Sequence, residues 1–243
     1  MTAAGPDGRG GPHLFVADLV RPELTDDDAH HLVRVLRTDV DDTITIADAE
    51  GRWAPGRVLD RSGAVEVAGP IREAPSPRWP LTVAFAPVKG DRPEWTVQKL
   101  TEIGVDRIVV VMAERSVVRW TGDRAVKQIA RLRRVAREAS MQSRRCRLPV
   151  IEGPSDVAEV FVAPGAVAAE PGGPPPSADD RLLVVGPEGG WSPSELAQAG
   201  HTVGLGPNVL RAETAAVVGA ALMVAIREGV ARPTTNSVDR QGG

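Results

Sequence analysis

Two segments near the C-terminus combine glycines with charged side chains, each directly after an apolar run. Residues 182–190 read LLVVGPEGG, and residues 203–216 read VGLGPNVLRAETAA. Glycine lets a backbone amide approach a ligand closely and adopt a positive φ. Ligands of α/β proteins usually bind at the carboxyl ends of strands. We therefore expect the two turns to form a ligand site that carries the charges of Glu188, Arg211 and Glu213.

These turns do not match the common nucleotide-binding loops. The lysine of the phosphate-binding loop GxxxxGK[ST] is missing, and neither turn reads GxGxxG after a strand. On spacing alone, two ordinary turns between a strand and a helix remain an alternative to a binding site. The residue types indicate a site without identifying its ligand.

Six collinear blocks of the chain, counting the two turns separately, resemble the motifs of one enzyme family. Besides GPEGG and LGxxxLRxETA in the two turns, HHLVRVLR lies at residues 30–37 and EWTVQKLTEIGV at 94–105. The blocks ERS at 114–116 and REASMQSR at 137–144 complete the set. Together they are similar to the RsmE family, SPOUT-superfamily methyltransferases that modify N3 of uridine in 16S ribosomal RNA.

The resemblance implies that the cofactor is S-adenosylmethionine, held largely by backbone groups of the two turns. Relatives commonly have an arginine where this chain has His13 and an acidic residue where it has Met141, but the cofactor motifs are intact. Carried over position by position, the expected cofactor contacts are Glu170, Gly186, Glu188, Gly189, Gly190, Leu205, Gly206, Leu210 and Thr214.

Methylation of uracil N3 requires removal of its proton and stabilisation of the resulting charge on O2 or O4. A carboxylate can act as the base and an arginine as the partner of the anion. Arg211 and Glu213 are close enough in sequence to reach one pocket, and we assign them these two roles. The alternative is structural: Glu213 would cap the following helix and Arg211 would pair with it.

The charge pattern allows RNA binding without demanding it. The formal net charge is −3, but seven arginines crowd residues 131–147. Arginine suits bidentate phosphate contacts and stacking on bases, although a solvated helix face explains such a stripe equally well. From motif and charge, the expected RNA contacts are Arg34, Arg37, Lys89, Arg115 and Arg144.

Several classes of protein are disfavoured. No apolar run reaches the roughly 18 residues needed to span a bilayer, and residues 1–12 do not resemble a secretory signal. We therefore expect a cytoplasmic protein. Cys146 is the only cysteine, and its position between two arginines is interpreted as incidental. No cluster of ligands surrounds His30 and His31, so no metal is expected.

Strand and helix patterns predict two units. Residues 1–75 contain short strand candidates at 13–17, 43–47, 57–59 and 64–68, with a helix beginning after Thr25, and the resemblance makes this unit a PUA-like RNA-binding β-barrel. Residues 76–243 alternate strands and helices, which predicts an α/β domain with a mostly parallel sheet and helices on both faces. The resemblance implies a SPOUT-type trefoil knot there.

Within residues 76–243, strands are expected at 81–86, 107–112, 148–151, 166–169, 182–185 and 202–205, and a mobile loop at 171–180. A helix is expected to begin at Asp91, with Glu94 as its capping-box partner, and to end at Gly104, with Trp95 in the core. The leading hypothesis is a homodimeric uridine-N3 methyltransferase acting on 16S ribosomal RNA, within the small ribosomal subunit. One alternative is a ribose 2′-O-methyltransferase of the same superfamily. The other is a non-catalytic RNA-binding module.

Overall fold

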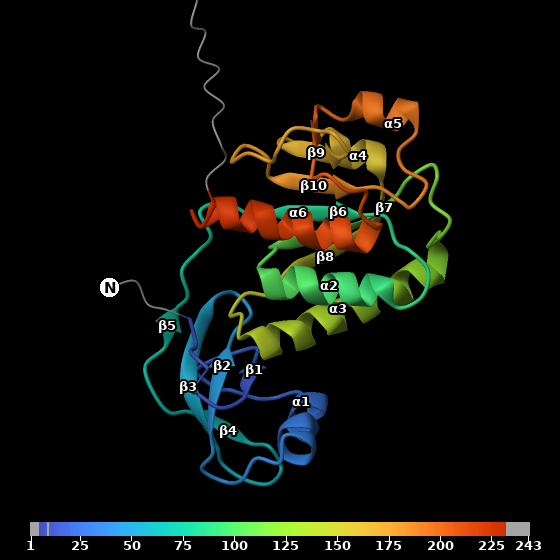
Figure 1. Cartoon of the computed structure of the whole chain (residues 1–243). Helices are drawn as coiled ribbons and strands as arrows, with labels where there is room; N and C mark the ends of the chain where they lie inside the picture. The colour runs from blue at the N-terminus through green and yellow to red at the C-terminus, as the bar shows by residue number, and fades with distance from the viewer. Residues whose placement is uncertain (1–4, 9, 232–243) are drawn as a thin grey trace, which may run out of the picture.

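The computed structural model describes residues 5–8 and 10–231, which form two packed units (Figure 1). The N-terminal unit is a five-stranded mixed sheet with the order β1-β2-β3-β4, and β5 pairs with β3. Its elements are β1 (His13–Phe15), α1 (Asp26–His30), the π-helical turn η1 (His31–Val35), β2 (Thr43–Ala47), β3 (Arg52–Val58), β4 (Val65–Val67) and β5 (Arg72–Glu73).

The sequence predicts the N-terminal strands well, except for the length of β3 and for the two-residue strand β5, which was not expected. Thr25 caps α1 as expected, because its side chain accepts a hydrogen bond from the Asp28 amide at 3.2 Å. The strand expected at 57–59 begins earlier, at Arg52, and pairs Pro55 with Thr45 of β2. The first half of β3 was not recognised in the sequence because it contains a proline and a glycine, which are both unusual in a strand interior.

The larger unit is a parallel six-stranded sheet with the order β11-β9-β10-β6-β7-β8. Helices α2, α3 and α6 pack on one face, and the short helices α4 and α5 pack on the other (Figure 1). The elements are β6 (Thr82–Phe85), α2 (Arg92–Ile103), β7 (Arg107–Met112), α3 (Gly122–Ser143), β8 (Val150–Asp156), α4 (Val157–Phe161), β9 (Ala166–Ala169), β10 (Leu182–Val185), α5 (Pro193–Gln198), β11 (Thr202–Val203) and α6 (Ala212–Arg227).

The C-terminal third has the crossing connections of a SPOUT-type fold. After β10 the chain runs to β11 at the far side of β9, and α6 then returns to contact β10 and β6. The segment 171–180 crosses the end of β11 backbone to backbone: the Gly204 amide donates to Pro174 O at 2.8 Å. A Cβ on Gly173 would lie 2.7 Å from Gly204 N, so the crossing requires glycine.

Segment 171–180, expected from its composition to be a mobile loop, makes specific contacts that join it to distant residues. The Asp180 carboxylate accepts hydrogen bonds from the Ser177 amide at 2.6 Å and from His201 Nε2 at 2.7 Å. These contacts tie the segment to the start of β11.

Two expectations for α2 need correction. Gly104 ends the helix in the left-handed conformation with φ 108°, as predicted. Asp91, however, makes no side-chain capping bond, and Glu94 pairs instead with Arg131 of α3 at 3.0 Å. Trp95, expected in the core from its helical spacing, is 44% exposed. Trp95 lies outside the buried side of α2, which consists of Pro93, Thr96, Val97, Leu100 and Thr101.

The arginine-rich end of α3 joins the two units. Arg137 donates to Asp28 Oδ2 at 2.5 Å and to Phe15 O at 3.2 Å. Arg144 donates to Gly11 O at 2.5 Å, and Arg147 donates to Glu50 O. Met141, which replaces an acidic residue of the resembled motif, packs against both apolar clusters of the N-terminal unit. Much of this basic stripe therefore serves contact between the units.

His13 also lies in this interface and makes folding sensitive to acid. Its Nε2 donates to Arg145 O at 3.1 Å, which leaves Nδ1 to accept from the Thr45 hydroxyl at 2.8 Å. Burial is the main cause that lowers the pKa of His13 from 6.5 to about 4. The hydrogen bond to Arg145 O acts in the opposite direction, and the charge of Arg144 lowers the pKa further. The folded state therefore favours the neutral imidazole.

We expect the free energy of unfolding to fall as the pH drops from about 6.5 to about 4, because the unfolded imidazole binds a proton in this window and the folded one does not. Above pH 7 this group should have no effect. Thermal melting of the wild type and of His13→Gln between pH 7.5 and pH 4.5 tests it. Parallel melting curves for the two proteins across this window would contradict the assignment.

Candidate active site

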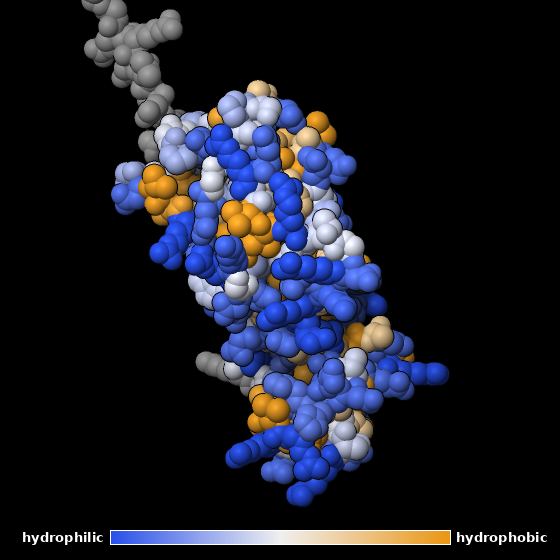
Figure 2. All heavy atoms as spheres, turned by 90° about the vertical axis from the view of Figure 1, so that its right-hand side faces the viewer, coloured by the Kyte–Doolittle hydropathy of each residue, from blue (hydrophilic) through white to orange (hydrophobic). Residues whose placement is uncertain are grey.

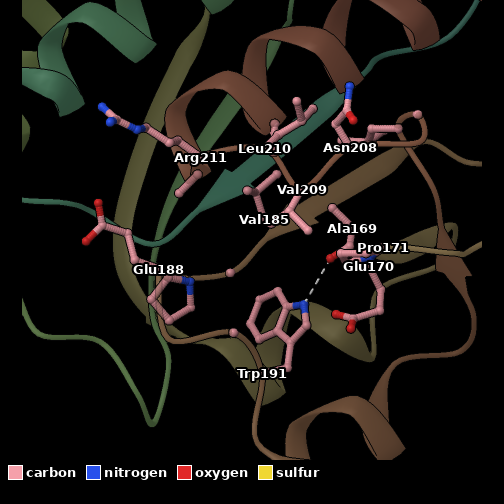
Figure 3. A pocket seen from close by; sticks show the side chains of 17 residues that line it. Ala169, Glu170, Pro171, Val185, Glu188, Trp191, Asn208, Val209, Leu210 and Arg211 are labelled. Carbon is pink, nitrogen blue, oxygen red and sulfur yellow. Dashed lines mark hydrogen bonds between the residues drawn. The ribbon is translucent and has the colours of Figure 1, made fainter.

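A cleft of about 380 Å³ lies at the carboxyl ends of β9, β10 and β11 (Figure 3). It is formed by the two glycine turns predicted from the sequence and by the end of β9. The residues that line it are Ala169, Glu170, Pro171, Val185, Gly186, Pro187, Glu188, Gly190, Trp191, Leu205, Gly206, Asn208, Val209, Leu210, Arg211, Ala212 and Ala215.

Most of the residues expected to contact a cofactor lie in this cleft. The lining includes Glu170, Gly186, Glu188, Gly190, Leu205, Gly206 and Leu210, but not Gly189 or Thr214. Gly189 faces the segment after β7 instead, because a Cβ there would lie 3.3 Å from Arg115 Cβ. Thr214 lies in the first turn of α6, between the lining residues Ala212 and Ala215, but is not itself part of the lining.

The wall of the cleft is built on Trp191, which sequence reasoning did not assign to the site. Its indole Nε1 donates to Ala169 O at 3.3 Å, and its ring packs edge-on against Phe161. A Cβ on Gly186 would lie 2.9 Å from this indole, so glycine is needed for the ring to fit. The position of Trp191 directly after the Gly-Gly pair was the available signal.

Apolar side chains form a slot opposite Trp191. Figure 3 shows Val185, Val209 and Leu210 around the upper part of the cleft. Val209 is 83% exposed, although it is a large apolar residue. An exposed valine inside a cleft predicts that a ligand covers it, since burial of apolar surface favours binding. The exposure of Val209 depends on tertiary structure, so the sequence could not reveal it.

Charged residues gather on one side of the cleft. Arg211 directly precedes α6 and is exposed, and its side chain has no hydrogen-bond or salt-bridge partner among residues 5–8 and 10–231. In Figure 3 its guanidinium points away from Leu210, toward the side on which Glu188 lies. Arg211 is therefore available to a ligand at the mouth.

Glu213 lies just outside the cleft lining and pairs with a residue that the sequence did not suggest. Its Oε1 is 3.7 Å from Arg92 Nη1, and its Oε2 is buried without a hydrogen-bond partner. The alternative in which Arg211 pairs with Glu213 is not found, because the described salt bridge of Glu213 is to Arg92. Arg92 also donates to Glu188 Oε1 at 2.9 Å.

The segment between β7 and α3 supports the first turn. Glu195 accepts from the Glu114 amide at 2.7 Å through Oε1 and from the Ser192 amide at 2.8 Å through Oε2. Arg115, an expected RNA contact, donates to Gly189 O at 3.2 Å. The ERS block thus holds the turn in place by two contacts: the Glu114 amide donates to buried Glu195, and exposed Arg115 donates to Gly189 O.

The remaining expected RNA contacts fall into two groups. Arg34, Arg37 and Lys89 are exposed and have no side-chain partner in the part of the chain that the structure describes. Lys89 follows β6 and lies at the same sheet edge as the cleft, whereas Arg34 and Arg37 lie on the N-terminal unit. Arg144 is half-buried and is used by Gly11, so an RNA contact would compete with the interface between the units.

The structure offers neither a reactive thiol nor a metal cluster nor a membrane-spanning helix among its described residues. Burial raises the pKa of the Cys146 thiol to about 12 despite neighbouring Arg147, so it is a poor nucleophile. Among the described residues, no group of three or more His, Cys, Asp or Glu side chains could hold a metal ion. In the same residues, no helix combines the length and apolarity that crossing a membrane requires.

Comparisons with known proteins agree with the geometry. The family model described as RNA methyltransferase domain matches residues 74–224, and that described as RNA methyltransferase PUA domain matches residues 24–66. Ribosomal RNA small subunit methyltransferase E from Mycobacterium tuberculosis is 35% identical over 79% of this chain and 81% of its own length. The enzyme of that name from Bacillus subtilis is 30% identical over 79% and 85%.

Solved structures give the same result. A probable rRNA methyltransferase from Porphyromonas gingivalis has a TM-score of 0.74 and 30% identity, covering 90% of this chain and all of that one. Ribosomal RNA small subunit methyltransferase E from Neisseria gonorrhoeae, bound to S-adenosyl methionine, has a TM-score of 0.74 and 28% identity, covering 87% and 96%. With the methyltransferase model matching well over half of its length, the chain belongs to the RsmE family of RNA methyltransferases, which couple a PUA domain to a SPOUT domain.

Proposed function

We propose that the protein transfers a methyl group from S-adenosylmethionine to N3 of a uridine in 16S ribosomal RNA. The observation that carries this proposal is a cleft with an apolar slot and an unpaired arginine, Arg211, at its mouth. The related enzyme from Neisseria gonorrhoeae binds S-adenosyl methionine. We further propose a boundary near residue 75 between the RNA-binding unit, residues 1–75, and the methyltransferase unit, residues 76–243.

The lining of the cleft fits S-adenosylmethionine. Its apolar slot suits an adenine ring, and the turns around Gly186 and Gly206 offer backbone donors and acceptors. Glu170 and Glu188 supply negative charge near a cofactor that carries a positive sulfonium. When bound, the cofactor supplies the electrophilic methyl group. The protein has to orient the uracil and stabilise its anion.

Arg211 is the proposed stabiliser of that anion. Its guanidinium has no partner in the described part of the chain, so it can donate to O2 or O4 as N3 loses its proton. Glu213 is the proposed proton acceptor. Its buried Oε2 lacks a hydrogen-bond partner among the described residues, which supports the proposal. The proton would have to pass from the cleft to Glu213, which lies just outside the cleft lining.

RNA would approach over the face that carries the mouth of the cleft. Figure 2 looks onto this side, where the connections after β6 and β7 lie, and the surface is mainly hydrophilic with small apolar clusters. We propose Arg34, Arg37 and Lys89 as contacts to the phosphate backbone, because all three are exposed and unpaired among the described residues. Arg115 and Arg144 would contribute only after giving up the contacts described above. Affinity should fall steeply with salt.

A homodimer is proposed from the composition of α6. Its outward side is apolar and includes Val217, Ala221 and Leu222, and Leu222 is 37% exposed. A helix with such a face favours contact with a partner, here a second copy of the chain. Light scattering after size-exclusion chromatography tests this proposal, and a monomer at micromolar concentration would contradict it. The proposed location is the cytoplasm, where the small ribosomal subunit is made.

The proposed reaction is tested by mass spectrometry of ribosomal-RNA nucleosides from cells that lack the protein. Loss of 3-methyluridine from 16S RNA, restored by the wild-type chain, is the expected result. Loss of a 2′-O-methylated nucleoside instead would support the ribose-methylating alternative. An unchanged nucleoside profile would support the non-catalytic RNA-binding alternative.

We expect Gly186→Ala to weaken binding of S-adenosylmethionine. The added Cβ would lie 2.9 Å from the Trp191 indole, which has to move and lose its bond to Ala169 O. Overpacking of this kind costs about 1–3 kcal/mol, which corresponds to a loss of roughly 5- to 140-fold in affinity. Calorimetric titration measures it.

Gly200→Ala is the matched control, because its Cβ would meet only Ala166 O at 3.9 Å. It should bind S-adenosylmethionine like the wild type. Unchanged affinity in Gly186→Ala would mean that Trp191 does not shape the cofactor site.

A further inference from the structure

Arg92 connects the two turns that form the cleft, although it lines neither. It lies in the first turn of α2, and its Nη1 donates to Glu188 Oε1 at 2.9 Å. The same nitrogen is 3.7 Å from Glu213 Oε1. Glu188 belongs to the turn after β10, and Glu213 belongs to the start of α6. One guanidinium nitrogen therefore bridges two segments that are distant in sequence.

Glu213 depends on this bridge for charge compensation. Its side chain is only 12% exposed, and Arg92 is its salt-bridge partner within residues 5–8 and 10–231. At 3.7 Å this contact is an ion pair rather than a hydrogen bond, and Oε2 has no hydrogen-bond partner among the described residues. A buried carboxylate in this situation is costly without a nearby cation. Removing Arg92 should therefore let the first turn of α6 shift.

The bridge bears directly on the proposed chemistry. Glu188 lines the cleft and lies on the same side as Arg211 in Figure 3. Arg211 directly precedes α6, two residues before Glu213, so fixing Glu213 also fixes the backbone that carries Arg211. Arg92 thereby sets both the first turn and the position of the proposed anion partner.

We propose that Arg92 is a positioning residue for methyl transfer, acting through Glu188 and Glu213 rather than by touching the uridine. This inference rests on the proposed function, because it assigns the support of that same site. A single nitrogen makes both contacts, so a lysine ammonium can replace it. Lysine should therefore rescue, which would not hold for an arginine that uses its planar fork.

The experiment compares Arg92→Gln with Arg92→Lys by single-turnover methylation of small-subunit particles and by calorimetric titration with S-adenosylmethionine. A small misplacement of catalytic groups can lower a rate about 100-fold, and this is the loss expected for Arg92→Gln at saturating cofactor. Arg92→Lys should retain most of the rate. Arg107→Gln is the control, because Arg107 makes a comparable exposed pair with Glu152 at the opposite end of the sheet.

A double-mutant cycle with Glu213→Gln tests whether Arg92 acts through Glu213. Contacting groups give non-additive losses, so the double variant should be little worse than the more damaging of the two single variants. Fully additive losses, or equal damage in Arg92→Lys and Arg92→Gln, would overturn the proposal.

The melting temperatures of the same four proteins are also measured without ligand. This measurement does not depend on methylation, so it tests the role of Arg92 separately from the proposed function. If the wild type methylates no uridine, the proposed function fails, and the coupling between Arg92 and Glu213 in melting still decides the bridge. No coupling in melting and no rate loss in Arg92→Gln would remove Arg92 from the site.

Discussion

Arg211→Ala should lower the rate of methyl transfer by about 100- to 1000-fold, the usual cost of losing a donor that stabilises a developing anion. Binding of S-adenosylmethionine should change far less. Arg211 is exposed at the mouth of the cleft and has no partner in the described part of the chain, so its removal leaves no buried group unpaired. The fold should therefore tolerate the substitution.

The physical reason is the difference between the ground state and the transition state. A neutral uracil needs little from a guanidinium, whereas the anion formed on loss of the N3 proton carries charge on O2 and O4. An interaction that strengthens only in the transition state raises the rate without tightening substrate binding. Arg211→Lys should recover little, because an ammonium cannot donate two parallel hydrogen bonds to planar acceptors.

The measurement is single-turnover methylation of small-subunit particles, with calorimetric titration of S-adenosylmethionine on the same samples. Equal losses in rate and affinity would assign Arg211 to cofactor binding. A rate within a few-fold of the wild type would remove it from the reaction. Arg92→Lys and Arg211→Lys make a useful pair, since lysine is expected to rescue the first position and not the second.

Strands of the larger unit could be predicted from the sequence because both faces of its sheet are covered. The apolar runs at 107–112, 166–169 and 182–185 match β7, β9 and β10 residue for residue. Strands buried on both faces read as unbroken apolar segments. The strand expected at 202–205 is shorter, ending at Val203, because the chain leaves the sheet edge where it crosses segment 171–180.

The contact partners of charged side chains could not be predicted from the sequence in the same way. The arginines of residues 131–147 fit a solvated helix face or an RNA surface equally well in the sequence. In the structure, Arg137, Arg144 and Arg147 instead contact the N-terminal unit. Helical periodicity identifies the polar side of a helix but not what that side meets. Likewise, Arg92 gave no local sign that it reaches Glu188, 96 positions away.

Asp106→Asn should destabilise the fold by about 3 kcal/mol, the lower end of the range for breaking a buried ion pair. Asp106 Oδ2 is 2.6 Å from Arg227 Nη1, and its Oδ1 is 3.8 Å from Arg145 Nη2. The side chain of Arg227 is only 6% exposed. Burial lowers the pKa of Arg145, Asp106 counteracts this, and the Arg227 charge adds to it. One carboxylate, whose side chain is 21% exposed, thus compensates the buried guanidinium of Arg227 and the partly buried guanidinium of Arg145.

Substitution by asparagine removes the negative charge of Asp106 but keeps the size and shape of its side chain. It keeps an oxygen that can accept from the Leu81 amide, which now donates to Asp106 Oδ2 at 2.9 Å, and it adds no bulk. Arg145 and Arg227 would then repel each other across a neutral amide. Because Arg145 O also accepts from His13, and Arg227 lies at the end of α6, the strain should affect both units.

Glu228→Gln provides the matched control, because Glu228 pairs with the same arginine from solvent. Its carboxylate is 2.8 Å from Arg227 Nε but 47% exposed, and exposed pairs contribute at most about 1 kcal/mol. For a chain of this size, Asp106→Asn should lower the melting temperature by roughly 6–12 °C, at about 2–4 °C per kcal/mol. Glu228→Gln should lower it by only a few degrees. Similar melting temperatures for the two variants would mean that the lower exposure of Asp106 does not decide how much an acid contributes to stability. A wild-type melting temperature for Asp106→Asn would show that Arg145 and Arg227 do not need its negative charge.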